Sequence, residues 1–503
     1  MPNKKPNILL ITSDQQHWNT LGCLNKEVKT PNLDKLAKQG VVFTRAYCSN
    51  PTCTPARASI ITGKYPSQHG AWALGTKLSE TEHTVGEDFS KAGYKTALVG
   101  KAHFQPTKST KEFTSLESEP IVHNKKFWKE FHGPFYGFDR VELARNHADE
   151  SIVGQHYVNW MEKNGCKNWK DYFLSPAGKV KNQKHKWLIP EQYHYDNWIA
   201  SQTNSLMEEY NKKGENFFLW ASFFDPHTKY LVPEPWDTMY DPDKITVPSV
   251  FRGEHANNPP HFKLTQQRNP DFSKWKESGK TMHGFYPHSV EKKVLAKDIA
   301  VYYAMVSLMD KYIGKILDRL EELNLAKNTI VVFTSDHGHF FGQHGLTTKG
   351  PFHYEDMIKI PFIARYPGHI PAGKRSCAMQ SLVDLAPTFL KYSGLDIPRE
   401  MTGVDQSAVW SGRKNQARNH VIVENHHEPT TIHLKTYADK RYKITTYFNQ
   451  KYGEMFDLKK DPKELNNLWN NKKHARLKTE LLMKLISAEM GKEPMWMPRI
   501  AGA

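Results

Sequence analysis

Cysteine is scarce in this chain of 503 residues, with only five in all, and their spacing is irregular. An odd, scattered set of this kind forms neither a disulfide framework nor the paired spacing of a structural zinc site. The five are Cys23, Cys48, Cys53, Cys166 and Cys377. At least one thiol is therefore expected to be unpaired.

Long hydrophobic runs are also lacking. The first apolar run, residues 8–11, is too short for the core of a signal peptide, and Ser13 and Asp14 follow it closely. No segment reaches the ~20 apolar residues that a membrane-spanning helix needs, so no membrane span is expected. The chain is expected either in the cytoplasm or, after removal of a signal peptide, in the periplasm or outside the cell.

Low-complexity tracts and internal repeats are absent, and 38% of the residues are hydrophobic, which is typical of a globular protein. Lys and Arg exceed Asp and Glu by 69 to 53, a net charge of +16. This surplus attracts anionic partners. Because the basic residues are scattered and no nucleic-acid-binding module is visible, we expect an anionic substrate and no nucleic-acid partner.

Continuous apolar runs of β type alternate with helical segments, a pattern that predicts a parallel sheet buried on both faces. The expected fold is α/β, with a large mixed, mostly parallel β-sheet flanked by helices. The expected strands are 7–12, 94–100, 217–224 and 329–334, and the expected helices are 33–39, 85–91, 195–212, 290–323 and 382–392.

Two stretches without a clear period, 104–187 and 237–288, are expected to be long insertions or loops. Near residue 415 the pattern changes to short antiparallel strands followed by a helix. We therefore predict a catalytic domain over 1–415 and a smaller C-terminal α+β subdomain over 416–503. Its expected elements are the strands 421–423, 430–435 and 441–448 and the helix 475–490.

Polar residues follow each of the four main strands. The carboxyl ends of parallel strands meet at one edge of a sheet, so these groups are expected to converge. Carboxylate and amide oxygens with an imidazole make a suitable cradle for a divalent cation. The groups are Asp14 and Gln15, Lys101 and His103, Asp225 and His227, and Asp336 and His337.

Cys53 opens the segment Cys-Thr-Pro-Ala-Arg. Pro55 suits the first turn of a helix, which places Cys53 at the helix N-terminus, where the dipole favours negative charge. Arg57, one turn later, reaches back over the same place. Alone, so short a motif favours a small buried cysteine beside a helix cap. Together with the strand-end groups, it favours a catalytic nucleophile.

These motifs resemble the sulfatase family of the alkaline-phosphatase superfamily, over residues 6 to about 470. The resemblance rests on residues 53–63 (CTPARASIITG), 100–103 (GKAH), 334–338 (TSDHG) with Lys349, and 452–468 near the C-terminus. The first motif is highly specific, because it is also the recognition site of the enzyme that oxidises the cysteine. The resemblance implies an alkaline-phosphatase-like fold and a sulfuric ester hydrolase.

The same resemblance implies a role for each residue. Cys53 would become formylglycine through a formylglycine-generating maturation enzyme, and its hydrate would attack sulfur. One divalent metal is implied, with calcium expected and manganese as the alternative. Its ligands would be Asp14, Gln15, Asp336, His337 and the modified Cys53.

The remaining motif residues would serve the nucleophile and the substrate. Arg57, Lys101 and His103 would steady the formylglycine diol. His227 and Lys349 would grip the sulfate, with His227 or His103 protonating the leaving oxygen, a task that contributes roughly 10²–10⁴-fold.

Two positions depart from the common sulfatase pattern. Gln15 stands where many sulfatases carry a second carboxylate, and His337 stands where many carry asparagine. Both variants resemble the phosphonate monoester hydrolase branch of the superfamily, so hydrolysis of phosphonate monoesters or phosphodiesters is the near alternative. A catalytically silent protein that binds sulfated glycans is an alternative of another class.

The expected substrate is a sulfated carbohydrate, since the net charge suits further anionic groups and aromatic side chains stack on sugar faces. A group of aromatic and histidine residues expected at the rim of the site either lines such a pocket or packs the insertions themselves. They are Trp128, His132, Trp169, His185, Trp187, Trp236 and His283.

Overall fold

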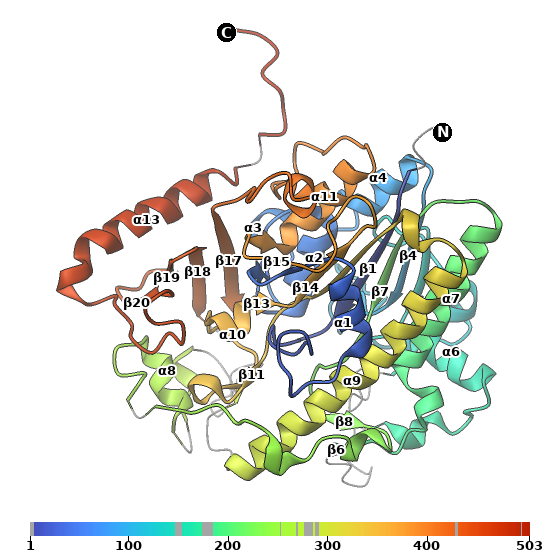
Figure 1. The fold of residues 1–503 in the computed structure, drawn as a ribbon, viewed down its shortest axis with the longest axis horizontal. Coiled ribbons are helices and arrows are strands. Elements are labelled where there is room, and N and C mark those ends of the chain that lie inside the picture. The colour runs from blue at the N-terminus through green and yellow to red at the C-terminus, as the bar shows by residue number, and fades with distance from the viewer. Residues whose placement is uncertain are drawn as a thin grey trace.

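An eight-stranded mixed sheet forms the centre of the protein in the computed structural model (Figure 1). Its order is β15-β2-β14-β10-β1-β7-β4-β5. The structure describes residues 5–145, 153–173, 185–251, 253–267, 270–275, 285–286, 291–427, 431–493 and 495–502. Most of the sheet is parallel, as expected from the alternation of apolar strands and helices.

Five adjacent strands of this sheet run parallel, and four of them are the predicted ones. They form because their apolar runs are buried on both faces, so every side chain of β1, β7 and β10 is in the interior. The four strands are β1 (Asn7–Ser13), β4 (Lys95–Gly100), β7 (Phe217–Ser222) and β10 (Thr329–Ser335).

Alternate residues of β1 enter two different hydrophobic cores, because successive side chains of a strand point to opposite faces. Ile8 and Leu10 lie in one core and Leu9 and Ile11 in the other. Helices α2 (Cys53–Thr62), α4 (Val85–Lys91) and α11 (Leu385–Tyr392) pack together over the first face. Helices α1 (Pro31–Lys38), α7 (Tyr195–Lys212) and α9 (Lys292–Glu322) cover the second (Figure 1).

The insertion expected over 104–187 is partly regular, which corrects the sequence-based expectation. Its segment β5 (Arg140–Leu143) is the edge strand of the main sheet, parallel to β4, and α6 (Gln155–Lys163) packs beside it. The strand was missed because its four residues, Arg-Val-Glu-Leu, alternate charge with apolar character in the manner of an exposed segment.

The other edge of the sheet contains β14 (Phe362–Arg365) and β2 (Val41–Phe43), both antiparallel to their inner neighbours, and β15 (Lys374–Ser376). In β14, Phe362 pairs with Thr334 and Arg365 with Val331, so the end of β14 lies at the amino edge of β10.

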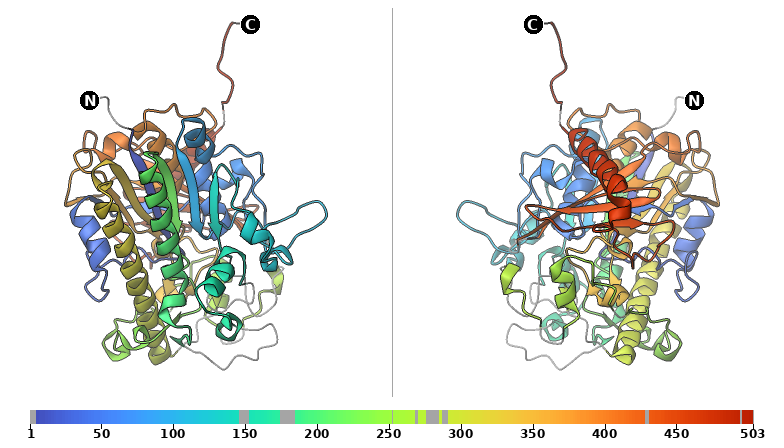
Figure 2. Two further views of the ribbon diagram at one scale, coloured as in Figure 1. Left: turned by 90° about the vertical axis from the view of Figure 1, so that its right-hand side faces the viewer. Right: turned by 90° about the vertical axis from the view of Figure 1, so that its left-hand side faces the viewer.

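A four-stranded antiparallel sheet follows near the C-terminus, and α13 (Ala475–Met490) packs on two of its strands, as Figure 2 shows. The helix has the predicted bounds, whereas the first two strands are longer than predicted and the fourth was not predicted as a strand. The strands are β17 (His420–His427), β18 (Ile432–Asp439), β19 (Tyr442–Tyr447) and β20 (Gly453–Asp457). Within the described residues, none of the helices combines the length and the apolar character that a membrane crossing requires.

Candidate active site

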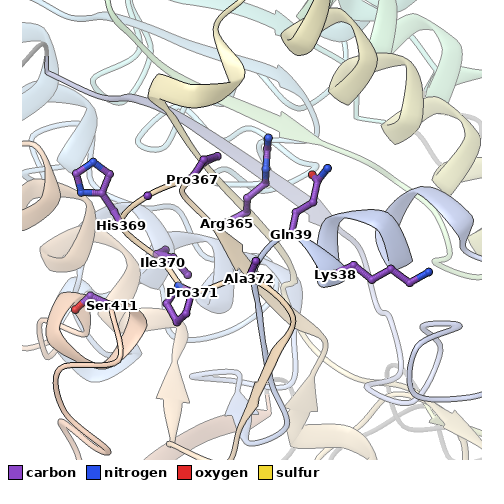
Figure 3. Close-up of a pocket in the computed structure, with 10 residues that line it drawn as sticks. Lys38, Gln39, Arg365, Pro367, His369, Ile370, Pro371, Ala372 and Ser411 are labelled. Carbon is purple, nitrogen blue, oxygen red and sulfur yellow. The ribbon is translucent and has the colours of Figure 1, made fainter.

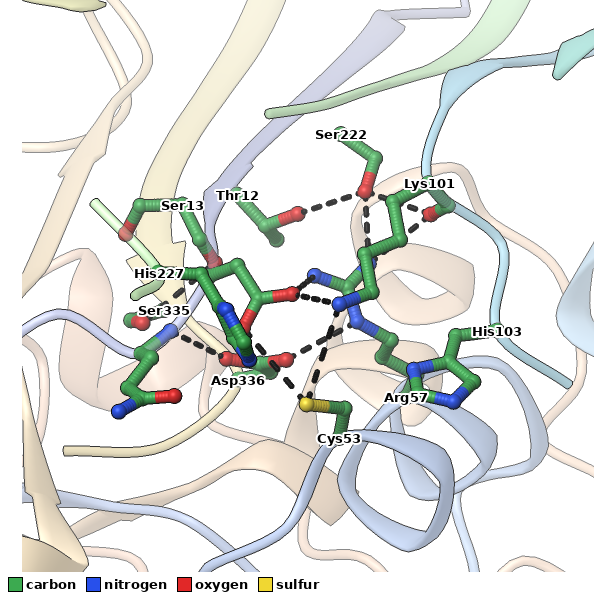
Figure 4. Close-up of polar contacts among 12 residues, drawn as sticks. Thr12, Ser13, Cys53, Arg57, Lys101, His103, Ser222, His227, Ser335 and Asp336 are labelled. Carbon is green, nitrogen blue, oxygen red and sulfur yellow. Dashed lines mark hydrogen bonds and ion pairs between the residues drawn. The ribbon is translucent and has the colours of Figure 1, made fainter. Parts of the chain in front are cut away.

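The carboxyl ends of three parallel strands bring Asp14, Lys101 and Asp336 to one place. Lys101 and Asp336 are labelled in Figure 4. The Lys101 ammonium pairs with the Asp14 carboxylate, and all three side chains are fully buried. Gly100 lets the end of β4 lie close to the end of β7. Its φ is 103°, and a Cβ atom there would lie 2.0 Å from the carbonyl oxygen of Ser222. The predicted meeting of strand-end groups therefore takes place.

Arg57 lies on α2, one turn after Cys53, and binds both carboxylates. Its Nε donates to Asp336 Oδ2 (2.9 Å) and its Nη2 to Asp14 Oδ2 (3.3 Å). Its Nη1 donates to the carbonyl of Lys101 (2.9 Å) and to Ser222 Oγ (2.7 Å). Arg57 thus holds both carboxylates in fixed orientations without touching solvent.

Cys53 begins α2 and is the buried centre around which the other groups gather. Its Sγ lies 3.2 Å from Lys349 Nζ, 3.2 Å from His337 Nε2 and 3.6 Å from Asp14 Oδ1. Lys101 Nζ lies 3.9 Å away. The Cys53 sulfur therefore faces both basic side chains, which stabilise an anion, and the carboxylate of Asp14.

The electrostatic balance at Cys53 favours negative charge. Burial and the nearby Asp14 carboxylate raise the pKa of the thiol, but Lys101, Lys349 and His337 outweigh them, so the pKa lies below its ordinary value. In turn, although burial lowers the pKa of Lys349, the charges of Cys53 and Asp14 raise it above the usual range. Lys349 is therefore a buried ammonium group ready to hold an anion.

Four buried ligand atoms, from Asp14, Cys53, Asp336 and His337, lie within 4.8 Å of one another, as a metal site requires. His337 Nδ1 is 3.0 Å from the carbonyl of Gly338 and donates to it, so Nε2 is the ring nitrogen that would bind a cation, once its proton has been displaced. The residues present therefore fit a divalent cation.

Gln15 supplies a second test of that fit. Its side chain is fully buried, and within the described residues its Oε1 accepts no hydrogen bond. A buried amide oxygen without a partner is costly, and a hard cation is a suitable partner for it. The backbone of Gln15 has φ 60°, a conformation that costs about 1–3 kcal/mol and is common at functional sites.

His227 and Lys349 face each other across the site. Lys349 Nζ donates to His227 Nε2 (3.0 Å), and His227 Nδ1 donates to the carbonyl of Thr228. Burial and the Lys349 charge lower the pKa of His227 well below its ordinary value. In the free protein at neutral pH this imidazole is neutral, with the Nε2 lone pair directed at the ammonium group.

His103 lies beside the Arg57 side chain in Figure 4. Its Nε2 accepts from Arg145 Nη2 (2.9 Å), so the ring proton is on Nδ1, which has no partner among the described residues. Burial, followed by the charges of Arg145 and Lys101, lowers the pKa of His103 well below its usual range.

The sequence predicted the residues at the centre of this cluster but not the residues that contact them from outside it. It missed Arg145 because the strand before it, β5, was expected to be a loop. It missed Ser222, which ends β7, because serine is common at strand ends. His339 and Tyr230 were missed although His339 stands two residues after His337, since neither carries a motif of its own.

The aromatic residues expected at the rim mostly pack the interior. Trp128 and Trp187 are 1% exposed, and Trp169 lies in a hydrophobic core. Trp236 is partly buried against the same core, and His283 lies outside the described residues. For the tryptophans, the packing alternative is therefore the correct one.

A surface hollow of about 670 Å³ lies elsewhere on the protein (Figure 3). Arg365, at the end of β14, lines it, so the hollow is at the amino edge of the sheet, opposite the strand ends that carry Asp14 and Asp336. His369 and Lys38 also line it, but no carboxylate or cysteine does. It is separate from the candidate active site.

Comparison with known proteins shows the family to which the chain is similar. The sulfatase family pattern matches residues 6–395, and a pattern described as N-sulphoglucosamine sulphohydrolase, C-terminal, matches residues 342–491. An arylsulfatase of Clostridium perfringens is 29% identical over 499 residues, covering 97% of this chain and 94% of the relative. An N-acetylglucosamine-6-O-sulfatase of Bacteroides thetaiotaomicron is 26% identical over 503 residues, covering 96% and 86%.

Among solved structures, a phosphonate monoester hydrolase of Agrobacterium radiobacter superimposes with a TM-score of 0.80. It is 23% identical in sequence, and the alignment covers 99% of this chain and 98% of the other. At that identity the likeness shows a shared fold.

Proposed function

The chain belongs to the sulfatase family of sulfuric ester hydrolases, and on this premise we propose that it desulfates a sulfated carbohydrate, using a formylglycine made from Cys53 and a divalent cation. The observation that carries the proposal is the placing of Cys53. It begins a helix, with the buried ammonium group of Lys349 and the Nε2 of His337 each 3.2 Å from its sulfur.

The sulfur of Cys53 stands where an oxygen of the hydrated formylglycine would lie. One hydroxyl of the hydrate would pass its proton to Asp14, whose Oδ1 lies 3.6 Å from the Cys53 sulfur, and its oxygen would attack the sulfur of the substrate. The bond from that sulfur to the alcohol oxygen would break, with its electron pair passing to the alcohol oxygen. The second hydroxyl then loses its proton, the carbon–oxygen bond to the sulfate breaks, and the aldehyde re-forms as inorganic sulfate leaves. Water restores the hydrate.

The cation would be held by Asp14, Gln15, Asp336 and His337 together with the modified Cys53. When bound, it neutralises charge on the sulfuryl oxygens and lowers the pKa of the nucleophile. Calcium is the cation that the two carboxylates and the amide oxygen favour, while the imidazole admits manganese.

Protonation of the leaving alcohol is assigned to His227. In the free protein Lys349 depresses its pKa, and an anionic sulfate placed between the two offsets that field. His227 Nε2 then gains a proton as substrate binds and delivers it to the alcohol oxygen. His103, whose Nε2 is occupied by Arg145, is left to donate from Nδ1 toward the nucleophile.

The carbohydrate class is supported by the relatives and by the charge. The printed name of one relative is N-acetylglucosamine-6-O-sulfatase, and that of another is delta 4,5-hexuronate-2-O-sulfatase. A net charge of +16 suits a substrate with several sulfate or carboxylate groups.

Two measurements test the proposal. Mass spectrometry of the peptide that contains Cys53 should show a lower mass than the thiol form and reaction with carbonyl reagents. A screen of defined sulfated oligosaccharides should then show sulfate release by the converted protein and none by Cys53→Ala. Binding of the oligosaccharides without any release would instead support the silent glycan-binding alternative.

Phosphorus substrates are the second candidate, because Gln15 and His337 resemble the phosphonate monoester hydrolase branch. Three cationic or potentially cationic side chains, Lys101, His227 and Lys349, surround the anion and favour three bare oxygens, as in a sulfate. We expect a higher kcat/KM for an aryl sulfate than for the matching aryl phosphonate monoester. A phosphonate rate tenfold higher, about 1.4 kcal/mol in transition-state binding, would reverse the assignment.

A further inference from the structure

Gln15 is held by three polar contacts, one at its side-chain amide and two at its backbone. Its Nε2 lies 2.9 Å from His339 Nδ1, its backbone N–H donates to Asp336 Oδ1 (2.9 Å), and its carbonyl oxygen accepts from the Tyr302 hydroxyl (2.8 Å). Only Oε1 is left without a partner in the part of the chain that the structure describes.

His339 is fully buried, and both of its ring nitrogens are engaged. Nδ1 faces the Gln15 amide, and Nε2 lies 2.9 Å from the Tyr230 hydroxyl. The ring is also stacked on Tyr302, with centroids 4.8 Å apart and planes at 24°. With both nitrogens occupied and the ring held flat, His339 supports Gln15 and is not itself a ligand.

The direction of these hydrogen bonds follows from the amide. An amide nitrogen only donates, so Nδ1 of His339 accepts, and the ring proton is on Nε2, where it is donated to Tyr230. If the Gln15 amide turned over, its oxygen would meet the Nδ1 lone pair, and its NH₂ group would point at the cation site. In this tautomer His339 therefore opposes that turn, because two lone pairs would face each other.

We propose that His339, whose Nδ1 contacts the Gln15 amide and whose Nε2 contacts Tyr230, is a positioning residue that directs Gln15 Oε1 at the divalent cation. This inference rests on the proposed function only in requiring a cation at the site. In this proposal the orientation of Gln15, the neutral oxygen ligand, is set by a residue that does not itself bind the cation. Loss of such a support typically weakens metal affinity by about 10–100-fold.

The test measures calcium and manganese binding directly, by isothermal titration calorimetry on metal-stripped protein with equal Cys53 conversion in every variant. His339→Leu keeps the apolar volume and removes the acceptor, so affinity should fall by about tenfold or more. His339→Asn offers an oxygen close to the Nδ1 position and should restore most of the affinity. Tyr230→Phe should give a smaller loss, because it removes the partner of His339 Nε2 and leaves the Nδ1 acceptor in place.

A double-mutant cycle separates positioning from a general structural effect. On a Gln15→Ala background no amide remains to be directed, so adding His339→Leu should weaken binding no further. An equal loss on both backgrounds would overturn the proposal. If His339→Leu fails to fold, Tyr230→Phe on the two backgrounds gives the same comparison: a loss confined to the Gln15 background supports the proposal, and an equal loss on both overturns it.

The binding measurement is also independent of turnover. A protein that binds the cation in the expected pattern but releases no sulfate would contradict the proposed function and leave the positioning role intact. An active enzyme whose cation affinity is unchanged by His339→Leu would contradict the positioning role and leave the proposed function intact.

Discussion

Two buried clusters of charged residues, one at the active site and one at the junction with the C-terminal sheet, use similar side chains differently. In the junction cluster, Glu424 on β17 accepts at both carboxylate oxygens: Ser67 N and Oγ each donate at 2.8 Å, and Lys435 lies at 3.2 Å. Lys492, after α13, pairs with the same carboxylate. Every Glu424 oxygen therefore has a partner within the chain.

The active-site cluster leaves polar atoms without partners. Gln15 Oε1 and His103 Nδ1 are buried and make no hydrogen bond to any described residue. Among the described residues, three cationic side chains, Arg57, Lys101 and Lys349, also gather around two carboxylates, those of Asp14 and Asp336. A paired cluster stabilises the fold, whereas an incompletely paired one is arranged for a ligand. Changes at the first should therefore affect stability, and changes at the second activity.

The largest effect is expected from Cys53→Ala. Turnover of aryl sulfate should fall by about 10⁴-fold or more, as when a catalytic nucleophile is deleted. The free energy of unfolding should change by only about 1 kcal/mol, because one sulfur atom is removed. Cys48→Ala is the matched control: Cys48 is buried in the hydrophobic core beside the site, so its loss should cost stability and leave turnover. Full activity of Cys53→Ala would contradict the mechanism.

Next in size is His227→Asn, which removes the proposed acid. We expect kcat/KM to fall by about 10²–10⁴-fold for an alkyl sulfate, whose leaving oxygen needs a proton, and much less for a nitrophenyl sulfate. His369→Asn, in the hollow at the opposite edge of the sheet, should change neither rate. Equal losses for both leaving groups would remove His227 from the acid role.

Asp336→Asn should weaken calcium binding by about 100-fold, since it removes a formal charge from a hard-cation site and the partner of Arg57 Nε. Calorimetry on stripped protein gives the affinity. Chelation should inactivate the native enzyme, and calcium or manganese should restore it. Fully active protein found by elemental analysis to contain no divalent cation would refute the site.

The smallest effect on catalysis is expected at the junction, where Glu424→Gln should leave kcat unchanged. Burial raises the pKa of Glu424, but the charges of Lys492 and Lys435 lower it by a larger amount, so that the pKa is about 2. A carboxyl group whose pKa is lower in the folded than in the unfolded protein stabilises the fold at pH values above its unfolded-state pKa. For Glu424 this stabilisation is about 3 kcal/mol, and it is lost as the pH falls through the folded-state pKa. Denaturant titrations should show the variant less stable at pH 7 and the difference shrinking between about pH 4 and 2. A constant difference at all pH values would contradict this cause.

The sequence by itself determined the elements whose signals are local. The runs that became β1 and β10 are apolar throughout, because both faces of these strands are buried, and α7 begins and ends where its periodicity predicts. The motif at Cys53 and the polar residues after each strand indicated the site, since chain direction alone brings parallel strand ends to one edge. The domain boundary at residue 415 stays a prediction.

Only the tertiary structure decided which residues support the site from outside it. Arg145 reaches His103 because β5 adds to the sheet edge, and its short, partly charged sequence resembles a loop. His339 and Tyr230, 109 residues apart, meet behind Gln15. Hydrogen bonds over such separations depend on how the packed elements are placed, and no local pattern encodes them. The residues of the proposed active site can thus be found in the sequence, whereas the contacts that orient them are set by the packing of distant segments.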